Sequence, residues 1–154
     1  MRTSRRNLLL MFGSAGLSPL VALAAAPSDL VVVVHPSVPK SSLDEFELEA
    51  IFLTSRRFWS GSQTIVPFNL PPRSEERVLF DHVVLRMDPD EVGRFWLDRR
   101  VRGGPTPPRQ APDALTAVRL TARLEGAIAY APLDVPLADV RVVARIHDGK
   151  VMRP

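Results

Sequence analysis

The 154-residue chain contains no cysteine, and this absence removes several classes of function. Without thiols the protein cannot form disulfides, use a cysteine nucleophile, or build thiolate zinc sites and iron–sulfur clusters. Lysine is also scarce, because only Lys40 and Lys150 occur among the 20 basic residues. The lack of cysteine does not identify a compartment, since an exported protein can also lack disulfides.

An excess of positive charge is missing from most of the chain, although basic residues outnumber acidic ones by 20 to 17. The whole surplus lies in the first 24 residues, where Arg2, Arg5 and Arg6 have no acidic counterpart. The remaining residues therefore carry no net charge. Nucleic-acid binding needs a clustered positive stripe, so the charge distribution argues against nucleic acid as a partner.

The sequence lacks the motifs of common enzymes. It has no Gly-x-Ser-x-Gly turn, no glycine-rich phosphate loop and no dinucleotide-binding fingerprint. The three histidines, His35, His82 and His147, are far apart and match no paired spacing for metal ligands. Three acids occur within residues 88–91, but acids collect at helix starts because of the helix dipole. We therefore predict a non-catalytic protein with no cofactor and no metal site.

Residues 1–26 have the layout of an export signal peptide. Arg5 and Arg6 are followed by an apolar stretch over residues 8–17 and by small-residue cleavage sites over 22–26. The paired arginines resemble a twin-arginine signal, and the Sec route stays open as the alternative. Glycine, serine and proline make the stretch poor for a membrane span, which needs ~20 apolar residues. We expect a periplasmic or extracellular protein that is not inserted in a membrane after processing.

The rest of the sequence alternates between strand and helix patterns. The β-branched run Leu30–Val34 predicts a strand that is buried on both faces. Ser42 and Glu45 have capping-box spacing, so a helix is expected there with Phe46 and Ile51 in the core. Further strands are expected over 63–69, 127–131 and 140–146, and further helices after the cap residues Ser74, Asp88 and Asp113.

This alternation predicts an α/β domain over residues 27–148. Residues 101–112 are rich in glycine and proline and are expected to form a loop. Gly126 is expected to terminate the last helix. The final residues, 149–154, are expected to be a frayed tail.

Polar residues that follow the first two predicted strands are the candidate ligand-binding residues. Unpaired N–H groups at a helix start can hold an anion, and ligands gather at the carboxyl ends of strands in α/β sheets. We select Ser37 and Ser41 after the first strand, and Asn69 and Ser74 after the second. The alternative is that the serines only cap helices.

Several short segments follow one another in a fixed order along the chain: Val31–Pro36, Ile51–Leu53, Phe58–Gly61, Ser74–Phe80 and Glu125–Tyr130. Together they resemble the periplasmic phosphate-binding proteins of ABC transporters. That family shows a valine-rich strand, a helix ending in Ile-Phe, a tryptophan with a turn glycine, a Ser-Gly-Thr-Arg-x-x-Phe signature and a Pro-Gly-Ala-Ile-Gly-Tyr segment. The resemblance implies a single lobe of a type 2 periplasmic-binding-protein-like fold, with a mixed sheet of about four to five strands flanked by helices.

The resemblance also implies an anion site at Ser74 and Arg77, which this chain alters. The alternative for Arg77 is that it pairs with a surface acid such as Glu45, Glu76 or Asp81. The family holds phosphate between two lobes, and this chain has room for one. Glu75 replaces the glycine of the signature and Glu76 replaces its threonine. Carboxylates beside a phosphate cost on the order of several kcal/mol at ~4–6 Å. We therefore expect weak or absent phosphate binding by the chain alone.

Two functions follow from these patterns. The first is an exported solute-binding-like protein that holds a small, phosphate-like anion or a protein partner. The second is an interaction or assembly module that keeps the lobe fold without binding a solute. In the second case the proline-rich loop 103–112, Trp59 and Trp96 would face a protein partner, since an unpaired lobe exposes its former cleft wall.

Overall fold

The structure is a computed structural model that describes residues 29–154. The expected signal peptide, residues 1–26, lies outside the described residues. The strands are β1 (Leu30–Val34), β2 (Val66–Asn69), β3 (Arg109–Gln110), β4 (Ala127–Pro132), β5 (Arg141–His147) and β6 (Lys150–Met152). The helices are α1 (Glu45–Phe52), α2 (Glu75–Phe80), the π-helical turn η1 (Asp81–Leu85), α3 (Pro89–Val101) and α4 (Ala114–Arg123).

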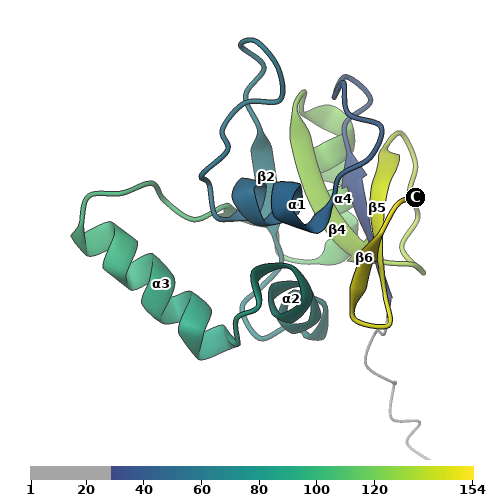
Figure 1. The fold of residues 1–154 in the computed structure, drawn as a ribbon. Helices are drawn as coiled ribbons and strands as arrows, with labels where there is room; N and C mark the ends of the chain where they lie inside the picture. The colour runs from purple at the N-terminus through teal and green to yellow at the C-terminus, as the bar shows by residue number, and fades with distance from the viewer. Residues whose placement is uncertain (1–28) are drawn as a thin grey trace, which may run out of the picture.

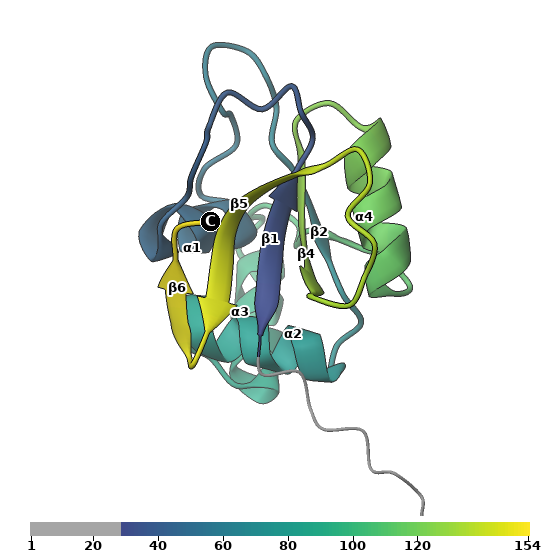
Figure 2. The same ribbon diagram turned by 90° about the vertical axis from the view of Figure 1, so that its right-hand side faces the viewer.

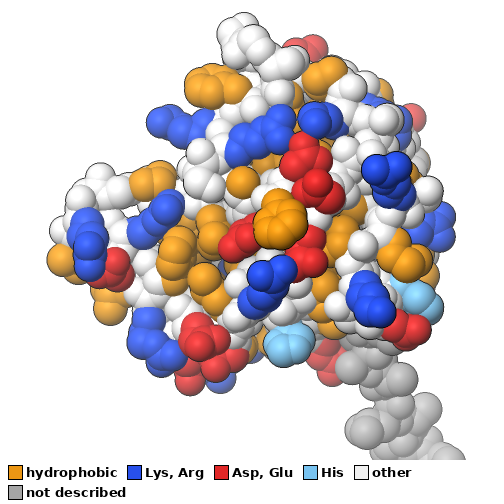
Figure 3. All heavy atoms as spheres, viewed as in Figure 1, with side chains coloured by type: hydrophobic (Ala, Val, Ile, Leu, Met, Phe, Trp, Pro, Cys, Tyr) orange, Lys and Arg blue, Asp and Glu red, His pale blue; other side chains and the backbone are white. Residues whose placement is uncertain are grey.

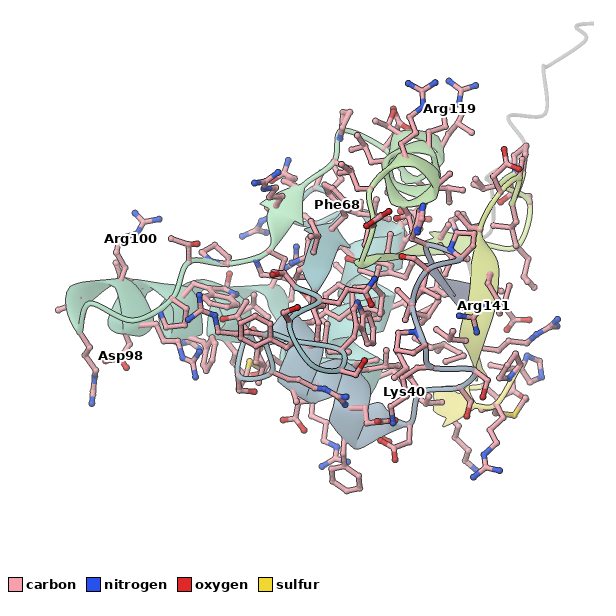
Figure 4. All side chains as sticks on the ribbon, turned by 90° about the horizontal axis from the view of Figure 1, so that it is seen from above. Lys40, Phe68, Asp98, Arg100, Arg119 and Arg141 are labelled. Carbon is pink, nitrogen blue, oxygen red and sulfur yellow. The ribbon has the colours of Figure 1, made fainter. Side chains whose placement is uncertain are left out.

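The fold is α/β, as predicted, with one mixed sheet and helices on both of its faces (Figures 1 and 2). The six strands are ordered β3-β2-β4-β1-β5-β6. Figure 4 shows α4, which carries Arg119, on one side of the sheet and α1 on the other. Helix α3, marked there by Asp98 and Arg100, projects from the body.

Strand β1 is the central element of the sheet, and all five of its side chains are buried. It runs antiparallel to both neighbours, with Val32 opposite Tyr130 of β4 and Ala144 of β5. Strands β2 and β4, in contrast, are parallel. The prediction of a strand buried on both faces is confirmed, because helices cover both sides of the sheet.

Helix α1 begins at a different residue from the one predicted. Asp44, rather than Ser42, is the cap: its carboxylate accepts from the Glu47 N–H at 2.9 Å, and the Glu47 side chain accepts from the Asp44 N–H. This shift turns Phe46 to the solvent, where it is 71% exposed, and buries Leu48 instead. The expected core position of Phe46 is therefore wrong, whereas that of Ile51 is confirmed.

The other helix starts agree with the sequence. Ser74, Asp88 and Asp113 each cap the helix that follows them by accepting a backbone N–H. Gly126 follows α4 with φ +75°, and a Cβ there would lie 2.1 Å from the Thr64 carbonyl oxygen. A glycine is therefore required at this turn into β4.

The expected tail and loop contain short strands. Lys150–Met152 form β6, which pairs antiparallel with β5, so residues 149–154 are not a frayed tail. Within the expected loop 101–112, Arg109–Gln110 form β3, which pairs with the end of β2. Strand β2 itself begins at Val66, later than the predicted start at residue 63.

The substitution Val32→Ala tests the central position of β1. It removes both methyl groups of a fully buried side chain, so the free energy of unfolding in urea should fall by ~1–3 kcal/mol. The matched change Val101→Ala, at an exposed position of α3, should alter it by less than ~0.5 kcal/mol. Equal effects of the two substitutions would contradict the assignment of β1 to the core.

Candidate functional site

A cavity of about 210 Å³ lies where the carboxyl end of β2 meets α2 and α3. We call it the β2–α3 cavity. Its walls are mostly apolar, with Pro72, Pro89, Val92, Pro107 and Pro108 among them. Its polar and aromatic lining residues are Asn69, Arg73, Arg77, Asp81, Trp96 and Gln110. Apolar walls with a few convergent polar groups are typical of small-molecule sites.

Arg77 is a buried basic residue that lines this cavity, and its guanidinium already has hydrogen-bond partners within the protein. Its Nε donates to Asp81 Oδ2 at 2.5 Å, and Nη1 donates to the Leu70 carbonyl oxygen at 3.2 Å. Both Arg77 and Asp81 are buried. Arg77 therefore pairs with one of the acids considered from the sequence, but inside the protein and not on its surface.

Asp81 brings a carboxylate into the candidate site. Burial raises the pKa of Asp81, and the neighbouring Arg77 guanidinium partly opposes that effect. Its second oxygen, Oδ1, is buried and has no hydrogen-bond partner within the described residues. The pair is thus neutral overall, so an anion entering the cavity gains little from Arg77 and meets the charge of Asp81.

The start of α2 lies beside this cavity and carries the two carboxylates noted in the sequence. Ser74 Oγ accepts from the Arg77 N–H at 3.3 Å. Glu75 and Glu76 follow in the first turn of α2, and neither lines the cavity. An anion at the Ser74 hydroxyl would therefore approach a helix turn that already holds two negative charges.

Asn69 joins the cavity to the core of the sheet. Its side chain is buried, and Oδ1 accepts from the Tyr130 hydroxyl at 3.3 Å. That hydroxyl also accepts from the Leu70 N–H. Burial raises the pKa of Tyr130, so this phenol stays protonated and remains a donor.

The predicted ligand-binding residues that follow β1 do not lie near those that follow β2. Because β1 is antiparallel to β4 and β4 is parallel to β2, the carboxyl ends of β1 and β2 lie at opposite edges of the sheet. Ser37 is exposed and contacts His35 and Gln63, and Ser41 is exposed. The structure thus brings Asn69 and Arg77 together beside Ser74, and places Ser37 and Ser41 elsewhere.

Four of the polar and aromatic residues that line the cavity, Arg73, Asp81, Trp96 and Gln110, are not among the ligand-binding residues predicted from the sequence. Asp81 lies four residues after Arg77, a spacing that places the two side chains on one helix face. Trp96 and Gln110 reach the cavity from α3 and β3, and no local pattern identifies them. Within residues 29–154 no group of three metal-ligating side chains is suited to hold an ion, and no helix is long and apolar enough to cross a bilayer.

Comparison with known proteins identifies the fold. No family model and no curated protein matches the sequence. Among solved structures, an ABC-type phosphate transport receptor from Vibrio cholerae matches with a TM-score of 0.61 and 17% identity over 77% of this chain and 46% of the receptor. A protein described as a phosphate ABC transporter substrate-binding protein with bound phosphate, from Clostridium perfringens, matches with a TM-score of 0.62 and 17% identity. That match covers 81% of this chain and 47% of the other protein. PstS from Borrelia burgdorferi matches with a TM-score of 0.59 and 13% identity, over 77% of this chain and 48% of PstS.

The chain has the fold of one phosphate-receptor lobe. This confirms the resemblance inferred from the sequence at the level of the fold, since identities of 13–17% establish no more than that. The lobe spans about half the length of each receptor it matches. The Vibrio cholerae neighbour is described as a transport receptor and the Clostridium perfringens neighbour as a substrate-binding protein, not as enzymes.

The Arg77–Asp81 pair can be tested by a mutational cycle. Arg77→Ala or Asp81→Ala leaves one charge buried without its partner, so each should lower the free energy of unfolding by ~3–5 kcal/mol. The double variant should lose less than the sum of the two. The exposed pair Asp98–Arg102 at the carboxyl end of α3, with the same spacing, is the control and should contribute ~0–1 kcal/mol. Similar losses at both pairs, measured by urea denaturation, would show that Arg77 and Asp81 are not buried together.

Proposed function

We propose that this lobe is an exported, non-catalytic, solute-binding-like protein that does not bind free phosphate tightly by itself. The single observation that carries the proposal is the state of Arg77, the base in the receptor-like signature. Its guanidinium is buried and bonded to Asp81 and to the Leu70 carbonyl. The likeness to phosphate receptors supports a solute-binding ancestry, and the occupied arginine argues against retention of phosphate.

The groups left for phosphate are few. Micromolar affinity requires about −8 kcal/mol after the cost of association. Arg73, which pairs with Asp90, together with Ser74 and the first N–H groups of α2 would have to supply this beside Glu75 and Glu76. Contacts in an open site act at high dielectric and are screened by salt. Tight binding by the lobe alone is therefore not expected.

Export is part of this proposal and stands on residues 1–26 alone. The paired arginines, the apolar stretch and the alanine-rich segment support it. The mature protein is then periplasmic or extracellular, with a new N-terminus near Ala25–Pro27. The mass of the secreted chain tests this, and a cytoplasmic protein that keeps its first residues would contradict it.

Calorimetry with inorganic phosphate tests the main proposal. The unmodified chain should show no binding tighter than ~1 mM at low salt. The variant Glu75→Gln with Glu76→Gln removes both charges from the start of α2, so phosphate affinity should rise several-fold at low salt and the gain should vanish at high salt.

The control for that experiment is Asp134→Asn with Asp139→Asn, which removes two exposed charges at positions outside α2. It should leave phosphate affinity unchanged within twofold. A low-micromolar dissociation constant with one phosphate per unmodified chain would contradict the proposal.

An interaction module is the second candidate, and α3 favours it. This helix projects from the body (Figure 1) and exposes 60% of Leu97 and 78% of Val101. Phe95 and Trp96 lie half-buried beside them, in edge-to-face contact. Exposed apolar side chains on a projecting helix are typical of an interface.

One part of the earlier interface hypothesis is wrong. Trp59 does not face a partner, because it is buried and its Nε1 donates to the Gly126 carbonyl oxygen at 2.8 Å. The loop is exposed over residues 103–107, whereas Pro108 and Ala111 are buried. The available surface is therefore α3 together with the first half of the loop.

Sedimentation equilibrium of the purified chain tests this second candidate. If α3 is an interface between copies, the chain should self-associate, and Leu97→Glu with Val101→Glu should weaken that association at least tenfold, since a charge replaces apolar contact. Leu133→Glu, at another exposed position, should have little effect. A chain that stays monomeric at all accessible concentrations would remove the support for self-association through α3.

A further inference from the structure

A second and larger hollow, of about 820 Å³, lies at the opposite end of β2. Its walls come from the segment after α1, from the start of β2 and from the loop between α3 and β3. Figure 3 shows Lys and Arg side chains gathered on this part of the surface, near the connection from α1 to β2. We call this hollow the arginine groove, after its lining residues Arg56, Arg57 and Arg109.

The charge of this groove differs from that of the whole chain. Three arginines line it and no aspartate or glutamate does, although residues 25–154 carry no net charge. Arg56 is structural, because it bonds Glu47 and the carbonyls of Phe58 and Trp59. Arg57 and Arg109 are exposed, and neither forms an ion pair with any residue from 29 to 154. The groove therefore presents two guanidinium groups that are not neutralised by a partner.

Thr54, on the wall of the groove, carries two local energetic costs. Its φ is +57°, in the left-handed region that β-branched residues avoid. Such backbone strain costs on the order of 1–3 kcal/mol and persists where the surrounding structure imposes it. Its hydroxyl is also buried without a hydrogen-bond partner in the described part of the chain. Rotation of this side chain toward the groove that Thr54 lines would let a bound anion supply the missing acceptor.

The size and lining of the groove indicate the class of ligand. Organic ligands occupy sites of roughly 300–1,000 Å³, and a bare phosphate would fill a small part of such a space. The guanidinium of arginine matches carboxylate and phosphate groups in a forked geometry. The two unpaired arginines come from separate segments, and Ile51, Ile65 and Pro67 supply an apolar floor.

We propose that the arginine groove binds a small polyanion that carries two or more carboxylate or phosphate groups. Arg57 and Arg109 each take one anionic group, and the Thr54 side chain rotates so that its hydroxyl donates to the same ligand. The site is independent of phosphate binding at α2, because the β2–α3 cavity shares none of these residues. Two free arginines do not make the continuous stripe that a nucleic acid needs, so the ligand is a small molecule.

Calorimetry of the full chain with citrate and with tripolyphosphate tests the proposal, at about 20 mM and about 300 mM salt. At least one probe should bind with one molecule per chain, and salt should weaken it. Citrate alone would indicate a carboxylate ligand, and tripolyphosphate alone a condensed or organic phosphate. If neither probe binds at low salt, the proposal is wrong.

The variant Arg57→Gln with Arg109→Gln should lower the affinity at least tenfold. Its control is Arg119→Gln with Arg123→Gln, which removes the same charge from the exposed face of α4 and should change affinity by less than twofold. Figure 4 places Arg119 on the other side of the molecule from α1. Equal losses of affinity in both double variants would show that the probe binds through the overall charge of the protein, and would contradict the proposed site.

The substitution Thr54→Gly tests the backbone strain at this position separately from the binding role of the hydroxyl. Glycine adopts φ +57° without cost, so the variant should unfold at a higher temperature while it binds the probe several-fold more weakly. Thr54→Val, which keeps the branch and removes the hydroxyl, should show the same loss of affinity. Unchanged affinity in both variants would contradict the role of Thr54.

The outcomes also distinguish this site from the proposed function. Tight phosphate binding that is lost in Ser74→Ala and kept in Arg57→Gln with Arg109→Gln would contradict the proposed function and leave the groove intact. Inorganic phosphate that binds in the groove as tightly as the polyanions would overturn the requirement for two anionic groups.

Discussion

The buried side chain of Tyr130 is the interaction on which the candidate site depends. Its ring stacks on Phe80 at a centroid distance of 3.9 Å and meets Phe52 edge-on, so it joins β4 to α2 and α1. Its hydroxyl bonds Asn69 and the Leu70 N–H, and the Leu70 carbonyl in turn accepts from Arg77. One aromatic ring thus sets the position of both the helix and the loop that form the cavity, because a buried phenol must satisfy its hydroxyl.

Helix caps and apolar runs, which depend on neighbouring residues in the sequence, correctly predicted several helix starts and the central strand. Ser74 and Asp88 cap their helices as the sequence indicates, and the run Leu30–Val34 is buried because no polar side chain interrupts it. The predicted start of α1 is wrong because two capping-box patterns overlap at residues 42–47. The choice between them is non-local: the Leu43 N–H bonds the Val143 carbonyl of β5, which keeps the chain extended up to Asp44.

The candidate site was harder to predict, because a local sequence pattern does not determine whether two strands run parallel or antiparallel. The prediction of Ser37 and Ser41 as ligand-binding residues assumes that the carboxyl ends of β1 and β2 share an edge, which holds for parallel strands. The antiparallel pairing of β1 with β4 separates them. Arg77 and Asp81 have a spacing that predicts a pair, but its burial depends on α3 and on the β3 segment, which are distant in the sequence.

The two hollows share β2 as a wall, and this gives the lobe an uneven distribution of charge. At the carboxyl end of β2 the arginine is neutralised by Asp81, while at the other end Arg57 and Arg109 have no acidic partner. Strand β3 belongs to both hollows, since Arg109 pairs with Phe68 and lines the groove, whereas Gln110 pairs with Asn69 and lines the cavity. The two hollows are therefore neighbours along β3, although they share no lining residue. A fold can keep its framework while its charged groups lie at different ends of one strand, so the likeness to phosphate receptors does not determine where this lobe would hold an anion.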